Sequence, residues 1–256
     1  MHPVNKLLLP FGIQIIRERK HTGRIDRPKS RVPRSFASDY NRQFRKLKTD
    51  NRGFLILKDF YYEAGEHPSD DETIQCEFAS SLLYRLRPET ILDIGSYRKY
   101  VIGLLAHTRV TTLDVRPRQP FSEAETVLTS DAKQIDLPDN QFDAVVALCA
   151  LEHFGLGRYG DEFDLEADRN AAGEMKRLLK PGGRLIFTTH ITNGQPAIAF
   201  NAHRIYSREM ILKLCKGLTC EDERFFDRLN RKYCSYDEVT SEVGAYSIYC
   251  GCWRKD

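Results

Sequence analysis

Polar residues that can bind or transform a ligand stand directly after short apolar runs of this sequence. They are Asp93 with Gly95, Asp114, Asp131, Glu152 with His153, and His190. Because ligands bind beyond the carboxyl ends of strands in an open parallel sheet, we expect these residues to surround one site. Carboxylates accept hydrogen bonds from ligand hydroxyls and amines, and the helix start expected after Gly95 favours anionic groups. The pattern therefore predicts a site for a nucleotide-like ligand.

Apolar runs and helical spacing alternate along the middle of the chain. The sequence predicts, in order, a strand at 91–94, a helix at 97–105, strands at 110–115, 127–128 and 142–149, a helix at 171–179 and a strand at 184–189. Pro181-Gly182-Gly183 predicts a sharp turn before the last strand, because proline and glycine suit turn positions. Such alternation predicts an α/β fold in which helices cover both faces of a mostly parallel sheet.

Further elements are expected before and after this alternating core. A helix is predicted from the acidic run at Asp70, which suits a helix N-terminus, up to Pro88, which stops it. A second amphipathic helix, beginning with a serine cap, is predicted at 207–216. Apolar residues at 225–226 and 244–253 predict two closing strands. We expect them to form a C-terminal antiparallel hairpin at the sheet edge.

The positive charge of the chain is concentrated near its N-terminus, although the net charge is only +3. Residues 19–38 are basic, interrupted by proline and poor in apolar side chains, which predicts an extended or mobile linker. A helix and a short apolar element are expected at 39–60. We therefore divide the chain into a basic N-terminal arm with lead-in elements, residues 1–69, and a folded domain, residues 70–256.

The apolar segment at 7–16 begins this arm. It is shorter than the ~20 residues needed to cross a bilayer and is interrupted by Pro10, so no transmembrane segment is expected. With basic residues after it, the segment could contact anionic lipid at a membrane surface. The alternative is that it packs on its own domain or on a partner subunit. Peripheral membrane contact through the arm and an internal packing role both remain open.

The seven cysteines show no regular spacing, which indicates reduced thiols and a cytoplasmic protein. Cys250 and Cys252 could form half of a metal site. No second cysteine or histidine pair at zinc spacing accompanies them. Residues two apart on a strand share one face, so we interpret both as buried strand cysteines and expect no metal site.

Between about Thr90 and Thr189 the sequence resembles the class I S-adenosylmethionine-dependent methyltransferases. The shared features, in the order of that superfamily, are the turn at Gly95, the acid ending the second strand, Asp-Ala before L-P-D-N-Q-F-D-A-V-V, Leu-Glu-His after that strand, and L-L-K-P-G-G-R-L-I-F. The stretch L-E-H-F-G-L-G-R-Y-G-D is also similar to a little-characterised methyltransferase-like family of unknown function, sometimes associated with sugar or polysaccharide metabolism. The resemblance implies a Rossmann-like class I methyltransferase fold with S-adenosyl-L-methionine as cofactor.

The resemblance places the methionine end of the cofactor at the glycine turn, shaped by Asp93 and Gly95. The superfamily usually shows D/E-x-G-x-G-x-G, whereas this chain continues with Ser96 and Tyr97. Side chains therefore stand where a bare backbone would approach the ligand. Tyr97 could compensate by facing the sulfonium cation, or these side chains lie on a solvated helix face.

Two further acids would bind the adenosine end. Asp114, about 20 residues after Gly95, would accept hydrogen bonds from both ribose hydroxyls, as acids do in dinucleotide folds. Asp131 would accept from the adenine amine, with Ala132 covering the ring. The alternatives are that Asp114 is a strand-end turn residue and that Asp131 is a capping residue.

Methyl transfer to a hydroxyl also requires that the proton of the hydroxyl be removed. The candidate catalytic residues in the expected mouth are His153, Glu152, Asp161 and His190. His153 is the first choice because the unperturbed pKa of histidine lies near neutrality. The alternative is that His153 only bonds loop backbone. The glycine-rich loop at 155–160 is expected to act as a substrate lid.

These observations predict an S-adenosylmethionine-dependent methyltransferase acting on a hydroxyl of a sugar-containing or small-molecule acceptor. The alternative is a non-catalytic methyltransferase-fold module that binds a partner or a membrane surface through its basic arm. A nicotinamide-dependent enzyme is disfavoured because G-x-G-x-x-G is absent. Nucleic acid is a weaker alternative, since the arm has no clear stacking platform and no recognised nucleic-acid-binding motif.

Overall fold

The computed structural model describes residues 33–49 and 70–256. The chain separates into two units, Met1–His67 and Pro68–Asp256. In the first unit, α2 (Arg34–Thr49) is a helix in which the Tyr40 and Phe44 rings stack, with centroids 6.1 Å apart. The apolar segment at 7–16 and the apolar element expected before Phe60 lie outside the described residues.

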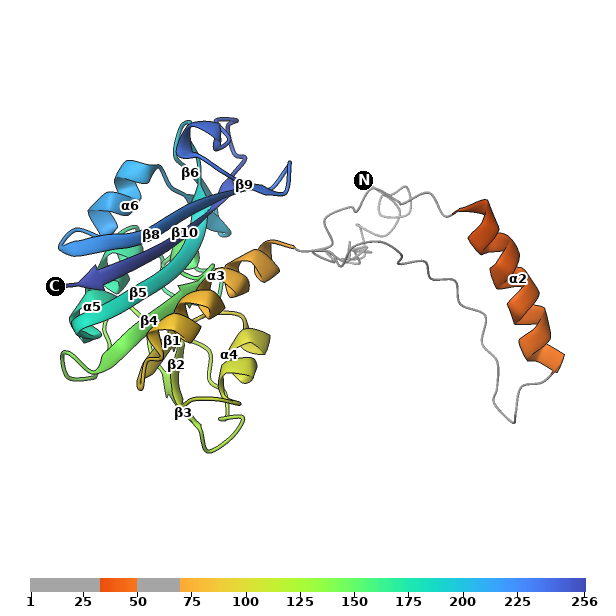
Figure 1. The fold of residues 1–256 in the computed structure, drawn as a ribbon. Coiled ribbons are helices and arrows are strands. Elements are labelled where there is room, and N and C mark those ends of the chain that lie inside the picture. The colour runs from red at the N-terminus through yellow and green to blue at the C-terminus, as the bar shows by residue number, and fades with distance from the viewer. Residues whose placement is uncertain (1–32, 50–69) are drawn as a thin grey trace, which may run out of the picture. The chain divides into compact units, whose positions relative to one another are not determined.

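The second unit is built on an eight-stranded sheet in the order β3-β2-β1-β4-β5-β10-β8-β9 (Figure 1). The strands are β1 (Ile91–Ile94), β2 (Val110–Asp114), β3 (Glu125–Thr129), β4 (Phe142–Leu148), β5 (Leu179–Ile191), β8 (Leu218–Asp227), β9 (Lys232–Cys234) and β10 (Ser247–Lys255). The first five strands in the spatial order are parallel, and β10, β8 and β9 each pair antiparallel with the strand before them. This confirms the predicted mixed sheet with C-terminal antiparallel strands. The two predicted closing strands, β8 and β10, do pair antiparallel, but β10 lies between β5 and β8 instead of at the sheet edge. β9 is the edge strand at this end of the sheet, and β3 is the edge strand at the other end.

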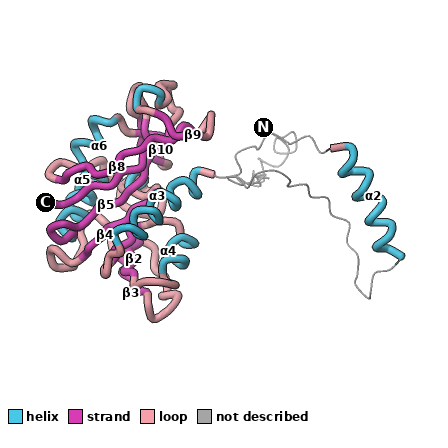
Figure 2. The backbone as a smooth tube through the Cα atoms, viewed as in Figure 1, coloured by secondary structure: helices cyan, strands magenta, loops and turns pink. Residues whose placement is uncertain are grey.

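Helices cover both faces of this sheet, as predicted (Figure 2). They are α3 (Asp71–Leu86), α4 (Arg98–Leu104), α5 (Ala167–Leu178) and α6 (Arg208–Leu214). Side chains of β4 alternate between two buried cores, with Val145 and Ala147 facing α5 and α6, and Ala144 and Val146 facing α3 and α4. Burying a large aliphatic side chain contributes about 1.5–3 kcal/mol, which explains why this strand is apolar throughout.

The ends of α3 follow from their sequence. Asp70 is the N-cap, and its carboxylate accepts a hydrogen bond from the backbone N–H of Thr73 at 2.8 Å. Arg87 ends the helix in the left-handed conformation, with φ of 46°, directly before Pro88. The prediction of this helix is confirmed, and α6 begins in the same way with Ser207 as its N-cap.

The predicted turn at Pro181-Gly182-Gly183 is wrong, because these residues lie inside β5. Leu179 already pairs with Phe142 of β4, and the pairing register shifts before Ala144. Gly182 has φ of +78°, a conformation that glycine adopts without a steric cost. The proline and glycines therefore form an irregularity within the strand, so β5 begins before them.

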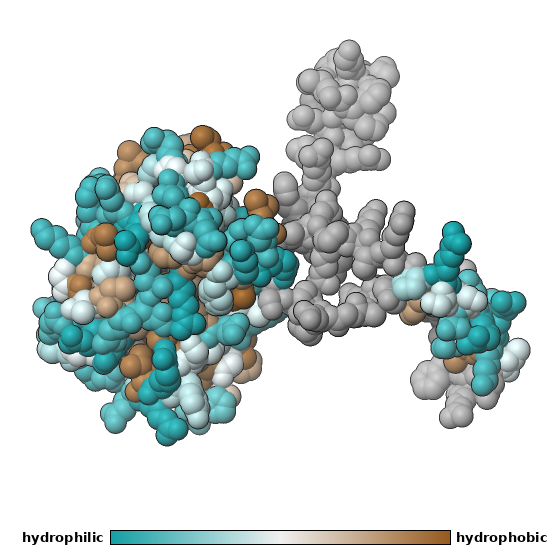
Figure 3. Space-filling view, turned by 45° about the horizontal axis from the view of Figure 1, so that its top comes forward, coloured by the Kyte–Doolittle hydropathy of each residue, from teal (hydrophilic) through white to brown (hydrophobic). Residues whose placement is uncertain are grey.

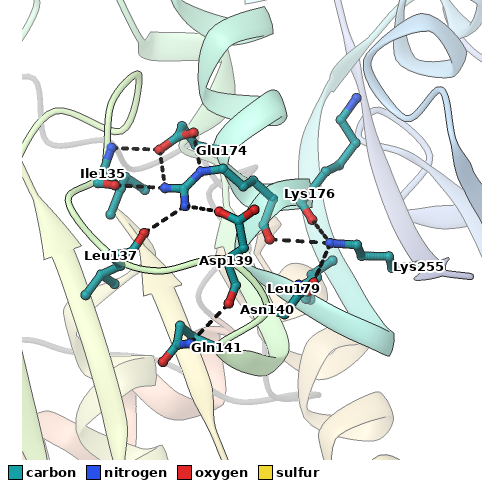
Figure 4. Close-up of polar contacts among 10 residues, drawn as sticks. Ile135, Leu137, Asp139, Asn140, Gln141, Glu174, Lys176, Leu179 and Lys255 are labelled. Carbon is teal, nitrogen blue, oxygen red and sulfur yellow. Dashed lines mark hydrogen bonds and ion pairs between the residues drawn. The ribbon is translucent and has the colours of Figure 1, made fainter.

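Two basic side chains make hydrogen bonds near the start of the parallel strands β4 and β5 (Figure 4). Arg177, near the end of α5, donates to the carbonyl of Ile135 in the loop before β4 at 2.8 Å. Lys255 of β10 donates to the carbonyls of Lys176 and Leu179, both at 2.8 Å. A cation at a helix C-terminus is favourable, so α5 and the last strand stabilise each other.

Two strand cysteines of the second unit lie in its core, and the face of the molecule drawn in Figure 3 is mostly polar. Cys250 and Cys252 are 0% and 1% exposed in β10, which confirms the prediction of buried strand cysteines. The face in Figure 3 is mostly hydrophilic, with separate apolar areas. Among the described residues, no helix is both long and apolar enough to span a bilayer.

Candidate cofactor and active site

A cavity of about 50 Å³ lies beyond the carboxyl ends of β1, β2 and β4. The predicted site residues that line it are Gly95, Asp114, Asp131, Ala132, His153 and Asp161. The position is the one at which open parallel sheets bind ligands. Residues assigned to the cofactor and residues assigned to catalysis therefore meet at one cavity.

The glycine turn after β1 is shaped by Asp93, which is 1% exposed and does not line the cavity. One carboxylate oxygen accepts from the backbone N–H of Ser96 at 3.3 Å, and the other has no hydrogen-bond partner among the described residues. Burial raises the pKa of Asp93 to about 6. Gly95 has φ of +68°, and a Cβ there would stand 3.2 Å from Cβ of Ala150. Glycine thus suits both the backbone conformation and the close approach.

Ser96 and Tyr97 point away from the cavity. The Ser96 hydroxyl accepts from the backbone N–H of Leu148 at 3.0 Å and joins the turn to β4. The Tyr97 hydroxyl accepts from the side-chain amide of Gln75 in α3 at 2.9 Å, and burial raises its pKa. Neither residue lines the cavity, so both support the turn from behind.

Asp114, at the end of β2, is held by Arg116 in a bidentate pair. The guanidinium nitrogens of Arg116 lie 3.0 and 2.8 Å from the two carboxylate oxygens. Burial alone would raise the pKa of Asp114, but the hydrogen bonds from Arg116 outweigh it and lower the pKa. The guanidinium also lies 4.5 Å from the ring centroid of Tyr159. Arg116 and Tyr159 both line the cavity, whose volume is well below the roughly 300–1,000 Å³ of ligand pockets.

Asp131 caps a turn and lines the cavity. One carboxylate oxygen accepts from the backbone N–H of Lys133 at 2.9 Å and caps the turn after β3. The other lies 3.5 Å from the ammonium group of Lys133. The side chain nevertheless lines the cavity beside the buried Ala132. Capping the turn therefore keeps Asp131 at the cavity wall.

Glu152 and His190 lie behind the cavity wall rather than in it. Glu152 belongs to the short helix η2 (Leu151–His153), and its side chain is fully buried. One carboxylate oxygen accepts from the Thr189 hydroxyl at 3.0 Å, and the other lies 3.5 Å from Nε2 of His190. Burial raises the pKa of Glu152 to about 7. Burial, and then the charge of neighbouring histidines, lowers the pKa of His190.

His153 lines the cavity and bonds the loop backbone at the same time. Its Nδ1 lies 2.6 Å from the carbonyl oxygen of Ala202, so Nδ1 carries a proton that it donates there. Nε2 therefore holds the lone pair of the ring and lies 4.0 Å from Sγ of Cys149. Burial lowers the pKa of His153 to about 4, so the ring is neutral at pH 7.

Asp161 shapes the glycine-rich loop that forms one side of the cavity. Its carboxylate accepts from the backbone N–H groups of Gly157 and Tyr159, at 3.3 and 3.0 Å. The neighbouring Arg158 donates to the carbonyl of Ala202 at 3.2 Å instead of pairing with this acid. Asp161 thus holds the loop in place, and its oxygens are already engaged.

Several residues at the site were not predicted. Arg116 could have been found from its position two residues after Asp114. Tyr246 stacks on His190, with ring centroids 3.7 Å apart, and Arg228 lies 4.1 Å from the centroid of Tyr246. Tyr246 and Arg228 come from the segments around β9 and β10, and no local pattern marks them.

Comparison with solved structures agrees with this architecture. The 1,6-didemethyltoxoflavin-N1-methyltransferase of Burkholderia thailandensis, solved with 1,6-didemethyltoxoflavin and S-adenosylhomocysteine, has a TM-score of 0.53 and 17% identity over 91% of this chain and 94% of that chain. The [4+2]-cyclase SpnF has a TM-score of 0.55 and 18% identity over 85% of this chain and 94% of that chain. The chain has the class I S-adenosylmethionine-dependent methyltransferase-like fold that the sequence predicts.

Comparison at the sequence level adds a family of unknown function. A family model described as Caenorhabditis protein of unknown function, DUF268, matches residues 116–221. The match contains the stretch at 151–161 that resembles a little-characterised methyltransferase-like family. No curated protein matches the sequence.

Proposed function

We propose that this chain is an S-adenosylmethionine-dependent methyltransferase that acts on a hydroxyl of a small-molecule or sugar-containing acceptor. The observation that carries the proposal is that one cavity is lined by His153 and by four of the expected cofactor residues, Gly95, Asp114, Asp131 and Ala132. The methyltransferase from Burkholderia thailandensis, which shares the fold, was solved with S-adenosylhomocysteine and a small acceptor.

The residues of the cavity fit an adenosyl ligand. Asp114 would accept hydrogen bonds from the ribose hydroxyls, and Asp131 with Ala132 would meet the adenine. Gly95 would leave room for the methionine end, because any side chain there would approach Ala150. S-adenosylmethionine supplies a methyl group whose sulfur leaving group is already activated. Positioning of the acceptor is then the main task of the protein, and it can supply roughly 7 to 11 kcal/mol.

His153 is the proton acceptor that the geometry favours. The hydrogen bond from Nδ1 to Ala202 fixes the ring and leaves Nε2 without a proton. Of the other candidates, Glu152 and His190 do not line the cavity, and the Asp161 carboxylate is engaged by its own loop. A hydroxyl held near His153 could therefore transfer its proton to Nε2 as the oxygen becomes nucleophilic.

One observation favours the alternative of a non-catalytic module. Arg116 already satisfies both carboxylate oxygens of Asp114, and the cavity is small. The cyclase SpnF also has this fold, so the fold alone does not assign methyl transfer. In this alternative the basic arm would bind a partner or a membrane surface. Its first 32 residues lie outside the described part of the chain.

Thermal unfolding with added ligands distinguishes the two proposals. A ligand at 100 times its dissociation constant stabilises the protein by ~2.7 kcal/mol, which raises the Tm by roughly 5 to 10 °C for a domain of this size. We expect such a rise with S-adenosylhomocysteine and none with NAD. The rise should be lost in Asp114→Ala and kept in Asp237→Ala, which removes an exposed carboxylate of η3 (Tyr236–Glu238). No rise with S-adenosylhomocysteine in the wild-type protein would contradict the enzyme proposal and favour the module.

A further inference from the structure

A group of metal-binding side chains lies at the carboxyl ends of β4 and β5. Cys149 follows β4, Glu152 lies on η2, and His190 is near the end of β5. One donor atom from each of these three residues lies within 4.8 Å of the other two. Thiolate, carboxylate and imidazole together form a donor set typical of zinc.

The distances between these atoms leave space for a small ion. Sγ of Cys149 lies 3.7 Å from Nε2 of His190, and this nitrogen lies 3.5 Å from Oε1 of Glu152. Bonds of about 2.0–2.3 Å to a tetrahedral zinc ion hold ligand atoms roughly 3.3–3.7 Å apart. These two distances fall within that range, and the donor atoms of Cys149 and Glu152 lie within 4.8 Å of each other.

Neighbouring contacts orient the set. The Thr189 hydroxyl donates to Oε2 of Glu152 at 3.0 Å and so leaves Oε1 directed at His190. The His190 ring is held by stacking on Tyr246. Metal ligands in proteins are commonly fixed by such outer contacts.

The buried carboxylate is the observation that most directly indicates a cation. The Glu152 side chain is 0% exposed, and no hydrogen-bond donor among the described residues satisfies its Oε1. An unpaired charge at such a depth costs several kcal/mol, so a buried carboxylate that keeps its charge is paired or binds a metal. Nε2 of His190, itself a metal-binding atom, lies 3.5 Å from Oε1.

We propose that Cys149, Glu152 and His190 form a three-ligand zinc site. A zinc site with three protein ligands keeps a fourth position for water or substrate. Cys149 lines the cavity together with His153, so an oxygen ligand at that position would lie beside the proposed proton acceptor. The inference deepens the proposed function, because it adds an oxygen-binding ion to the acceptor side of the same cavity. Metal binding itself does not depend on the cofactor.

Cobalt substitution in the full-length protein tests the site without any cofactor. The chelator-treated protein is titrated with Co²⁺, which reports a thiolate ligand through a sulfur-to-cobalt absorption band. We expect the band to saturate at one equivalent and Zn²⁺ to displace the cobalt. Cys149→Ser should abolish the band, whereas Cys220→Ser, which changes an exposed cysteine of β8, should leave it unchanged.

Glu152→Gln separates metal binding from folding. The amide keeps the shape of the side chain but removes its charge, so the metal-free variant should unfold at the same Tm as the wild type or above it. Its affinity for cobalt should fall at least about 10-fold. No band at one equivalent, a band that persists in Cys149→Ser, or an unchanged affinity in Glu152→Gln would overturn the proposal. S-adenosylhomocysteine binding is measured separately, so failure of the metal site and failure of cofactor binding are distinguishable.

Discussion

At the scale of single residues, Arg116 contacts the acid on which ribose binding would depend. Its guanidinium occupies both oxygens of Asp114 and covers Tyr159. A ribose ring needs the same carboxylate oxygens, so the ligand and Arg116 compete for them. The Arg116 side chain is 57% exposed, whereas the Asp114 side chain is 12% exposed. The arginine can therefore move into solvent when a ligand binds the acid, while the acid stays in place.

Replacing Arg116 should strengthen cofactor binding, because the guanidinium no longer competes for the Asp114 oxygens. Among the described residues, only the backbone N–H of residue 116, 2.9 Å from one of these oxygens, still donates to them. We expect Arg116→Ala to lower the dissociation constant of S-adenosylhomocysteine by up to about 5-fold in titration calorimetry. Arg224 forms the same bidentate contact with Asp222, which does not line the cavity, so Arg224→Ala is the matched control and should bind normally. Weaker binding by Arg116→Ala would show that the arginine contacts the ligand instead of competing with it.

At the scale of elements, α3 supports the glycine turn from behind. Gln75 of α3 is 1% exposed, donates to the Tyr97 hydroxyl at 2.9 Å and accepts from the Thr188 hydroxyl of β5. The same helix carries Asp71, which pairs with Arg228 at 2.6 Å. A buried polar side chain thus joins a helix, the turn after β1 and a central strand.

Removing that junction should destabilise the domain. Gln75→Leu keeps the volume but removes the partner of the Tyr97 hydroxyl and the acceptor of the Thr188 hydroxyl proton, at a cost of roughly 1–3 kcal/mol. Denaturant unfolding measures the change. The exposed Gln141 provides the control, and Gln141→Leu should stay within about 0.5 kcal/mol of the wild type. Equal stability of the two variants would mean that the buried contacts contribute little.

The elements also show what local sequence determines. The helix at α3 and the strand β4 were predicted because a capping acid and a continuous apolar run are local signals. The position of Pro181-Gly182-Gly183 inside β5 was not predicted, since it depends on pairing between Leu179 and Phe142. The three-residue strand β9 depends in the same way on its distant partner.

At the scale of the whole molecule, one buried acid links stability to pH. Glu125 begins the edge strand β3, and its carboxylate accepts from Arg98 at 2.7 Å, from the backbone N–H of Phe121 at 2.7 Å and from the Thr112 hydroxyl at 2.9 Å. The hydrogen bonds from Arg98 make the largest contribution in lowering the pKa of Glu125 to about 2, from the usual 4.5. The unfolded chain therefore binds a proton at this group before the folded chain does.

Stability should fall on acidification as a result. The contribution of Glu125 is fully present above about pH 4.5 and is lost as the pH falls toward 2. Glu125→Gln should lower the free energy of unfolding at pH 7 by roughly 2 kcal/mol and flatten its pH dependence between pH 5 and 2. The exposed Glu242 serves as control, and Glu242→Gln should follow the wild-type curve. Unfolding at each pH is measured by circular dichroism. If the stability of Glu125→Gln depended on acid as strongly as that of the wild type, Glu125 would not be the group responsible.

The fold of the whole molecule was more predictable than its site. Strand-end residues such as Asp114 were found because a parallel sheet brings these ends together. The contacts of Arg116 with Asp114 and Tyr159, and the cluster of Cys149 with Glu152 and His190, depend on side-chain directions that spacing does not determine. The arm stays a prediction, because residues 1–32 and 50–69 lie outside the described chain.

The central claim is that the cavity at Asp114 binds the cofactor. A crystal structure of the protein grown with S-adenosylhomocysteine tests it most directly. The account predicts adenosine in this cavity, ribose hydroxyls within about 2.5–3.0 Å of the Asp114 carboxylate, and the Arg116 guanidinium displaced from it. An Arg116 guanidinium that stays on Asp114 at saturating ligand, or ligand bound elsewhere, would contradict the account.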